Sequence, residues 1–156
     1  ATAINRVLDA VRDGRAGLQA GLQAGHHQTA VHFCFGNYGG QTIQKGTWAA
    51  LTAFLNSLHT DHLVLELAHR PPSDLDALKA VDTRIGLGLG VVDIKINHIE
   101  TPEEIARAIE RAEKTLGPNR VRYVHPDCGF WMLKRSIADR KIAALVKGRD
   151  LYLGRT

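Results

Sequence analysis

The sequence predicts an α/β fold with parallel strands, because short apolar runs alternate with segments of helical periodicity along most of the chain. The apolar runs, which are typical of buried strands, span residues 30–35, 62–66, 84–89 and 121–124. The helical segments span residues 42–58, 73–80, 101–116 and 135–147. Strand, helix and strand in this order favour parallel pairs with right-handed crossovers. Four such units make half of an eight-fold (β/α) barrel.

An open sheet of this size would leave strand edges unpaired and one apolar side poorly covered. Either upstream strands are missing from the chain, or two copies associate as a homo-oligomer to complete the sheet. The first residue is Ala1 rather than methionine, and we expect a processed or truncated product.

The segment before the first strand is predicted to be a helix followed by a linker. Apolar residues at helical spacing predict a helix over 2–13 that ends at Gly14; they are Ile4, Val7, Leu8 and Val11. The near-repeat GLQAGLQAGHHQ (17–28) is typical of a linker, with His26 and His27 in solvent. We therefore divide the chain into an N-terminal helix and linker (1–29) and a half-barrel (30–156). Within the latter, Thr101 is predicted to cap a helix whose first turn holds Pro102 and two acids.

Composition places the chain among globular domains without a nucleic-acid or membrane partner. It has 156 residues, of which 44% are apolar and 23% charged, and a net charge of +4. Positive residues are scattered among acids, which disfavours a nucleic-acid surface. No apolar stretch approaches the ~20 residues of a membrane span, so we expect a cytoplasmic protein. Two cysteines are no secreted disulfide framework, although a bond between them is left open.

Three positions near strand ends carry residues that bind metals. His32 and Cys34 are two apart in VHFCF and project to the same side of the strand, while Glu66 closes the run DHLVLEL. In parallel barrels such ends meet on one face, where active sites lie. The alternatives are a histidine and a cysteine in the core, and a salt bridge from Glu66 to His69 or Arg70.

A fourth candidate ligand, Cys128, follows the last predicted strand in the turn HPDCG. Two thiols, an imidazole and a carboxylate form a zinc ligand set, whereas the long separation of the cysteines excludes a zinc finger. The alternative is a plain strand-to-helix loop.

The third predicted strand carries further polar residues at its end. Asp93, Lys95 and His98 are candidate acid–base groups there, with a solvated loop as the alternative. The preceding GLGLG (86–90) has the wrong spacing for a dinucleotide fingerprint, and its glycines predict close approach of a ligand or a helix.

These segments together resemble the catalytic barrel of the cobalamin-independent methionine synthase family. The matching pieces are HFCFGN (32–37), Glu66, GLGVVDIK (88–95) with IETPEEI (99–105), and HPDCGF (125–130). They occur in family order and cover most of residues 30–148. The resemblance implies the C-terminal half of a TIM-type (β/α)8 barrel, of the short single-barrel kind. It also implies that His32, Cys34, Glu66 and Cys128 bind a catalytic zinc, and Asn37 and Asp127 are candidate substrate contacts.

The function implied is methylation of homocysteine to methionine. Zinc would activate the substrate thiol as a thiolate, and the donor would be a methyl-folate, whose nitrogen must be protonated to leave, or a methyl-corrinoid. The chain departs from the family's long form, because Lys95 stands where that form has a proposed proton-donating histidine and His125 replaces an asparagine.

The part of the family barrel that supplies acidic contacts to the homocysteine amine is absent. Three alternatives therefore stay open: a related zinc alkyl-thiol transferase, a non-catalytic zinc-binding half-barrel that needs a partner, and a thiol hydrolase using Cys34. No base-and-orienter spacing supports the hydrolase.

Overall fold

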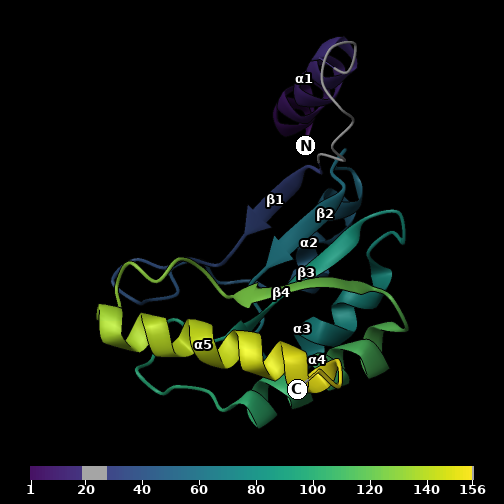
Figure 1. Cartoon of the computed structure of the whole chain (residues 1–156). Coiled ribbons are helices and arrows are strands. Elements are labelled where there is room, and N and C mark those ends of the chain that lie inside the picture. Colours follow the sequence, from purple (N-terminus) through teal and green to yellow (C-terminus); the bar gives the residue numbers. More distant parts are fainter. Residues whose placement is uncertain (19–27, 156) are drawn as a thin grey trace.

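The computed structural model describes residues 1–18 and 28–155. Strands and helices alternate along the chain after the first helix, as the sequence predicts (Figure 1). The elements are α1 (Thr2–Leu18), β1 (Ala30–Phe33), α2 (Trp48–Asn56), β2 (His62–Leu65), α3 (Pro72–Ala77), the short helix η1 (Leu78–Ala80), β3 (Gly86–Val92), α4 (Pro102–Leu116), β4 (Val121–Pro126) and α5 (Arg135–Tyr152).

The four strands form one parallel sheet in the order β1-β2-β3-β4. This is the predicted α/β architecture of half a (β/α)8 barrel. Because consecutive strands are neighbours and all run the same way, their carboxyl ends lie along one edge of the sheet (Figure 1). Within the described residues, β1 and β4 are the outer strands, each paired on one side only.

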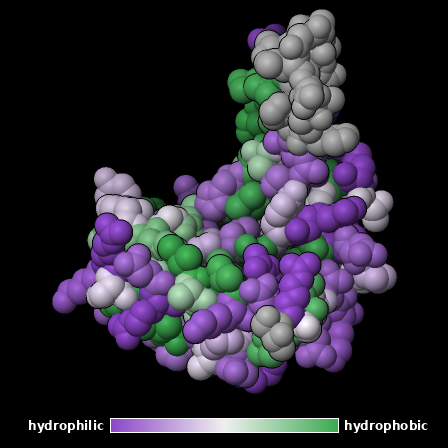
Figure 2. Space-filling model, in the orientation of Figure 1, coloured by the Kyte–Doolittle hydropathy of each residue, from purple (hydrophilic) through white to green (hydrophobic). Residues whose placement is uncertain are grey.

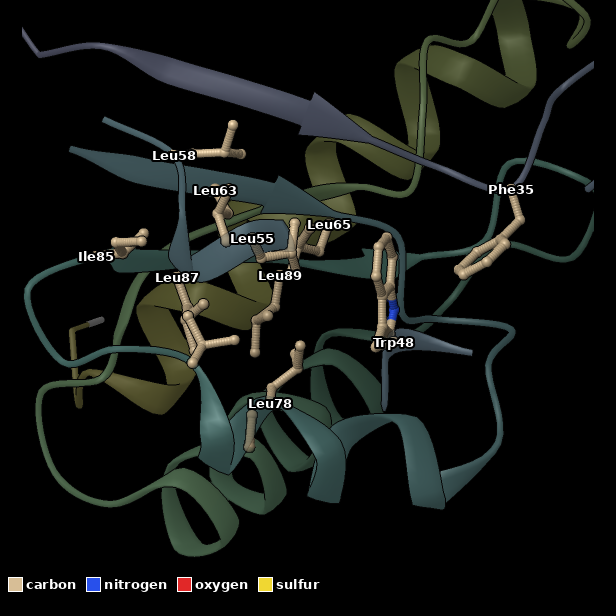
Figure 3. Close-up of a cluster of buried hydrophobic side chains, with 12 residues drawn as sticks. Phe35, Trp48, Leu55, Leu58, Leu63, Leu65, Leu78, Ile85, Leu87 and Leu89 are labelled. Carbon is tan, nitrogen blue, oxygen red and sulfur yellow. The ribbon is translucent and has the colours of Figure 1, made fainter. Parts of the chain in front are cut away.

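One face of the sheet packs against helices through a leucine-rich core (Figure 3). Leu63 and Leu65 of β2 and Leu87 and Leu89 of β3 are fully buried there against side chains of α2, η1 and α4. A second cluster joins the end of β3 to α4 and α5. This packing provides the main hydrophobic stabilisation of the fold.

Helix α1 lies beyond the amino ends of β1 and β2 (Figure 1), where its Asn5 donates to the carbonyl oxygen of Ser57 just after α2 at 2.8 Å. It is longer than predicted, because it runs through Gly14 to Leu18. A glycine costs a helix only about 1 kcal/mol relative to alanine, too little to end it without a capping geometry. The rest of the predicted linker, with His26 and His27, lies outside the described residues.

Helix α2 begins at Trp48, six residues after the predicted start at 42. The preceding segment instead folds back on the exit of β1, where the amides of Ile43 and Gln44 donate to the carbonyl oxygen of Phe35 at 3.0 and 2.8 Å. Ile43 is 59% exposed, so its apolar side chain is not part of the helical core face that the periodicity indicated. By contrast, Thr101 caps α4 with a complete capping box, as predicted.

The glycines of β3 make room for side chains of the following strand and turn. A Cβ on Gly88 would lie 3.3 Å from Nε2 of His125, and one on Gly90 would lie 1.9 Å from Oδ1 of Asp127. Close approach was predicted, and the protein groups that approach these two glycines belong to the neighbouring strand and its exit turn.

The surface over α5 is mixed in character. Figure 2 shows apolar patches among polar side chains where α5 crosses the view of Figure 1. Ile142 and Val146 of this helix are 46% and 43% exposed. No helix in the described part of the chain is long and apolar enough to cross a membrane.

Candidate metal centre

The structure brings together three of the four predicted ligands from opposite edges of the sheet. His32 lies near the end of β1, Cys34 just beyond it, and Cys128 in the turn after β4. One nitrogen or sulfur atom from each residue lies within 4.8 Å of those of the other two, and Nε2 of His32 is 3.3 Å from Sγ of Cys128. Both cysteines are free thiols and half-buried. Residues 96 positions apart in the chain therefore face one small volume.

Glu66 lies just after β2 and is fully buried, but it is not a member of this three-residue group. Its Oε2 is 3.3 Å from Nζ of Lys95. Its Oε1 has no hydrogen-bond partner among the described residues and lies 3.6 Å from Nε2 of His69. The predicted alternative of a salt bridge holds for His69 but not for Arg70, which pairs with Asp74 at 2.6 Å.

Asp127 joins the loop after Glu66 to the turn that carries Cys128. Its Oδ1 accepts hydrogen bonds from the amides of Leu67 and Ala68 at 2.8 and 2.9 Å, and its Oδ2 lies 2.7 Å from Nδ1 of His69. The carboxylate is fully buried, and Gly90 provides the space for it. Both carboxylate oxygens of Asp127, a candidate substrate contact, are thus engaged within the protein.

His69, Asp93 and Asp127 also place ligand atoms within 4.8 Å of one another. Within this group Oδ2 of Asp127 lies 2.7 Å from Nδ1 of His69, and Asp93 Oδ1 accepts from the amide of Lys95 at 2.7 Å. The carboxylates of this group and the His69 ring are thus already engaged in hydrogen bonds within the protein.

The three candidate acid–base residues after β3 point to different surroundings. Lys95 faces Glu66, whereas the exposed His98 lies 3.4 Å from Glu104 at the start of α4. The amide of Asp93 donates to Glu100 at 2.8 Å. Only Lys95 of the three thus contacts a predicted ligand.

Asn37 lies in the segment after β1 and contacts the turn that carries Cys128. Its Nδ2 donates to the carbonyl oxygen of Gly129 at 3.3 Å, next to Cys128. Its Oδ1 is buried without a hydrogen-bond partner among the described residues. The side chain is therefore placed beside the cluster with one acceptor available.

The electrostatics of the cluster favour a cation. Burial, followed by the hydrogen bond and charge of Cys34, raises the pKa of Cys128 to about 12, and the charge of Glu66 adds to this shift. Burial and then the neighbouring His125 lower the pKa of His32. A divalent cation suits both shifts, because it favours the deprotonated form of the Cys128 thiol and binds a neutral imidazole.

The donor set fits zinc on the observations above. Two sulfur atoms and an imidazole nitrogen are soft or intermediate ligands, and Glu66 Oε1 is a buried oxygen without a hydrogen-bond partner among the described residues, beside this group.

Several supporting residues gave no sequence signal strong enough to single them out. Trp48 donates its indole N–H to the carbonyl oxygen of Glu66 at 3.1 Å. Lys141 of α5 is fully buried and donates to the carbonyl oxygen of Asp93 and to Glu100, each at 2.8 Å. Lys141 lies on the face of α5 that carries Ala144 and Gly148, and this spacing was the one available clue that the lysine is buried.

The fold and the cluster define a parallel half-barrel with a thiol–imidazole centre at the carboxyl ends of its strands. The family model described as "Cobalamin-independent synthase, Catalytic domain" matches residues 14–149, and the chain belongs to this family.

Relatives of the chain carry the name methionine synthase. The present chain is 36% identical over 121 residues to the methionine synthase from Thermococcus kodakarensis. The match covers 78% of this chain and 32% of the relative. The chain is 29% identical over 141 residues to one from Saccharolobus islandicus, covering 90% and 37%. A solved structure of a B12-independent methionine synthase from Shewanella sp. W3-18-1, in complex with selenomethionine, matches with a TM-score of 0.64 and 25% identity.

This match covers 97% of the present chain and 46% of the solved one. The chain spans about a third of the length of the curated relatives it matches.

Proposed function

We propose that this chain is the zinc-binding part of a methyltransferase that methylates homocysteine to methionine. The observation that carries the proposal is the convergence of His32, Cys34 and Cys128 within 4.8 Å at the carboxyl edge of the sheet. The family and the names of its relatives support the reaction class.

His32, Cys34 and Cys128 would hold the zinc, and Glu66 is the fourth candidate ligand. Bound zinc lowers the pKa of a thiol until the thiol is deprotonated at neutral pH. Asp127 and Gly90 support this set by holding the Cys128 turn against the loop after Glu66.

The methyl donor is proposed to be a methyl-folate or a methyl-corrinoid. A folate nitrogen leaves poorly unless it is protonated, so a folate donor needs a general acid. The candidates at the exit of β3 are Asp93, Lys95 and His98. Of these, Lys95 is the residue that contacts a proposed ligand, Glu66.

Metal analysis tests the ligand set. We expect about one zinc per chain, and a large fall in Cys34→Ser, Cys128→Ser and His32→Gln. His98→Gln is the matched control, because His98 is 57% exposed and its ring pairs with Glu104 rather than with a proposed ligand. Full zinc retention in both cysteine variants would remove the metal centre from the proposal.

Substrate activation is tested by adding homocysteine to the zinc-loaded chain. About one proton should be released per site, because the thiol enters as a thiolate. Zinc binding without proton release would favour the second candidate function, a zinc-binding half-barrel that does not turn over alone. The two outer strands, each paired on one side, are the observation that favours this second candidate.

A methyl-transfer assay separates the two candidates and the donors. Methyl-folate and methyl-corrinoid are supplied side by side to this chain and to a longer chain that includes four upstream strands. Turnover only by the longer chain supports the half-barrel alternative. Transfer to another thiol, but not to homocysteine, supports the related alkyl-thiol transferase.

A further inference from the structure

Lys95 and Glu66 form a buried ion pair beside the cluster of His32, Cys34 and Cys128. The side chains of Lys95 and Glu66 are 10% and 0% exposed, and Nζ lies 3.3 Å from Oε2. The other oxygen of Glu66 has no hydrogen-bond partner among the described residues. Glu66 is therefore bound by a side-chain cation at one oxygen and available to a second partner at the other.

The backbone around Lys95 is fixed from two directions. Its amide donates to Oδ1 of Asp93 at 2.7 Å, and the amide of Asp93 donates to Glu100 at 2.8 Å. Lys141, fully buried in α5, closes this network by donating to both Glu100 and the carbonyl oxygen of Asp93. Ile94, between Asp93 and Lys95, is 1% exposed. Lys95 is thus held toward Glu66 rather than free at the surface.

We propose that Lys95 is the partner that keeps the Glu66 carboxylate paired when a substrate thiol replaces Glu66 at the metal. This rests on the proposed function. In the exchange the bond from Glu66 Oε1 to the metal would break, a bond from the metal to the substrate sulfur would form, and the thiol proton would pass to solvent, while Lys95 keeps its ion pair with Oε2. No group is oxidised or reduced.

The energetic reason is the cost of a buried carboxylate without a partner. A lone buried charge costs several kcal/mol, and removing one member of a buried ion pair leaves the other uncompensated. Lys95 removes this cost from the thiol-bound state and so favours thiol entry. This makes Lys95 a positioning residue that acts through Glu66, in place of the proton-donating role that its position in the family motif suggests.

The test uses cobalt-loaded protein, because the visible absorption of Co²⁺ reports both metal binding and entry of a thiol. In Lys95→Met, homocysteine should bind about tenfold more weakly or worse, because the displaced Glu66 has no cation to pair with. Affinity for Co²⁺ alone should be unchanged or higher, since Lys95 no longer offsets the negative charge of the carboxylate. Lys95→Arg should restore thiol binding.

This split separates the proposal from its rivals. A merely structural role for Lys95 would weaken metal and thiol binding together. A proton-donor role would change methyl transfer and leave the thiol affinity of Lys95→Met at the wild-type value. Either result overturns the proposal.

Glu66→Gln provides a second, independent check that does not depend on the fold of the lysine variant alone. A neutral amide does not require a cation, so adding Lys95→Met to Glu66→Gln should leave thiol affinity unchanged. An undiminished effect of Lys95→Met in that background overturns the coupling. Absence of cobalt–thiolate absorption in the wild-type chain would instead contradict the proposed function itself.

Discussion

The helix-covered face of the sheet and its open face are built from the same strands but from different side chains. The covered face presents Leu63, Leu65, Leu87 and Leu89, all at 0% exposure. The open face presents His32 and Cys34, with His125 close to Gly88 and Asp127 close to Gly90. The leucines of the covered face contribute apolar volume, which other apolar side chains could also provide. The residues of the open face contribute specific donors, acceptors and charges. Stability and chemistry are therefore separable by substitution in this fold.

The largest effect is expected from Trp48→Ala on the covered side. Trp48 is fully buried, contacts Phe35 edge-to-face and donates its N–H to the carbonyl oxygen of Glu66. Its loss should lower the free energy of unfolding by about 3–5 kcal/mol, as measured by chemical denaturation. Trp131→Ala is the matched control, because Trp131 is 67% exposed, and it should stay within about 0.5 kcal/mol of the wild type. Equal effects of the two variants would contradict the assigned core.

A smaller effect, on both stability and metal binding, is expected from Gly90→Ala. The new Cβ would lie 1.9 Å from Oδ1 of Asp127, so the Cys128 turn must shift. We expect a loss of about 1–3 kcal/mol in stability together with weaker metal binding. Gly14→Ala, which places its Cβ in open space on α1, should lower neither the stability nor the metal affinity. A Gly90→Ala protein with wild-type stability and metal affinity would show that Asp127 does not fix the turn.

How far the sequence predicts this division differs between the two faces. The alternation of apolar runs with helical segments predicted every strand and its parallel pairing. This was possible because burial of a strand or a helix face requires apolar residues at positions that can be recognised in the local sequence. The convergence of Cys34 and Cys128 was also predictable, since strand ends in a parallel sheet share one edge. The fold-back of residues 42–47 was missed, because it depends on hydrogen bonds to Phe35, which only the tertiary structure provides.

The supporting shell was the least predictable part of the site. Lys141 approaches Asp93 and Glu100 from a helix about 40 residues further along the chain. The spacing of charges within one helix gives no information about such a partner. For Gly90 the sequence predicted a close approach, but not that the carboxylate of Asp127 is the group that approaches.

The next prediction concerns reactivity and does not involve unfolding. In metal-free protein at pH 8, Cys128 should react with iodoacetamide at least tenfold more slowly than an unhindered thiol, because a pKa of about 12 leaves little thiolate. Mass spectrometry of the alkylated peptide measures the rate. Cys34→Ser should accelerate the reaction, since it removes a cause of the raised pKa. Alkylation of Cys128 at the rate of a free thiol would mean that the crowding around it is not as described.

The smallest expected effect is on the pH dependence of stability in metal-free protein, to which His69 and His32 contribute with opposite sign. The hydrogen bond to Asp127 raises the pKa of His69, whereas burial lowers that of His32. For His69 the folded state binds more protons, so its stabilising contribution is present below the unfolded value of 6.5 and is lost as pH rises through the higher folded pKa. For His32 the unfolded state binds more protons, so stability falls as pH drops below 6.5.

The two contributions therefore lie on opposite sides of pH 6.5 and can be measured one at a time. His69→Gln should flatten the stability profile above that pH, and His32→Gln should flatten it below, where His62 leaves a residual slope because burial lowers its pKa too. Denaturation midpoints between pH 5 and 8 give both slopes. If His69→Gln alters the acid side instead, the carboxylate of Asp127 is not its main partner. The pairing that joins the Glu66 loop to the Cys128 turn would then have to be assigned to the amides of Leu67 and Ala68 alone.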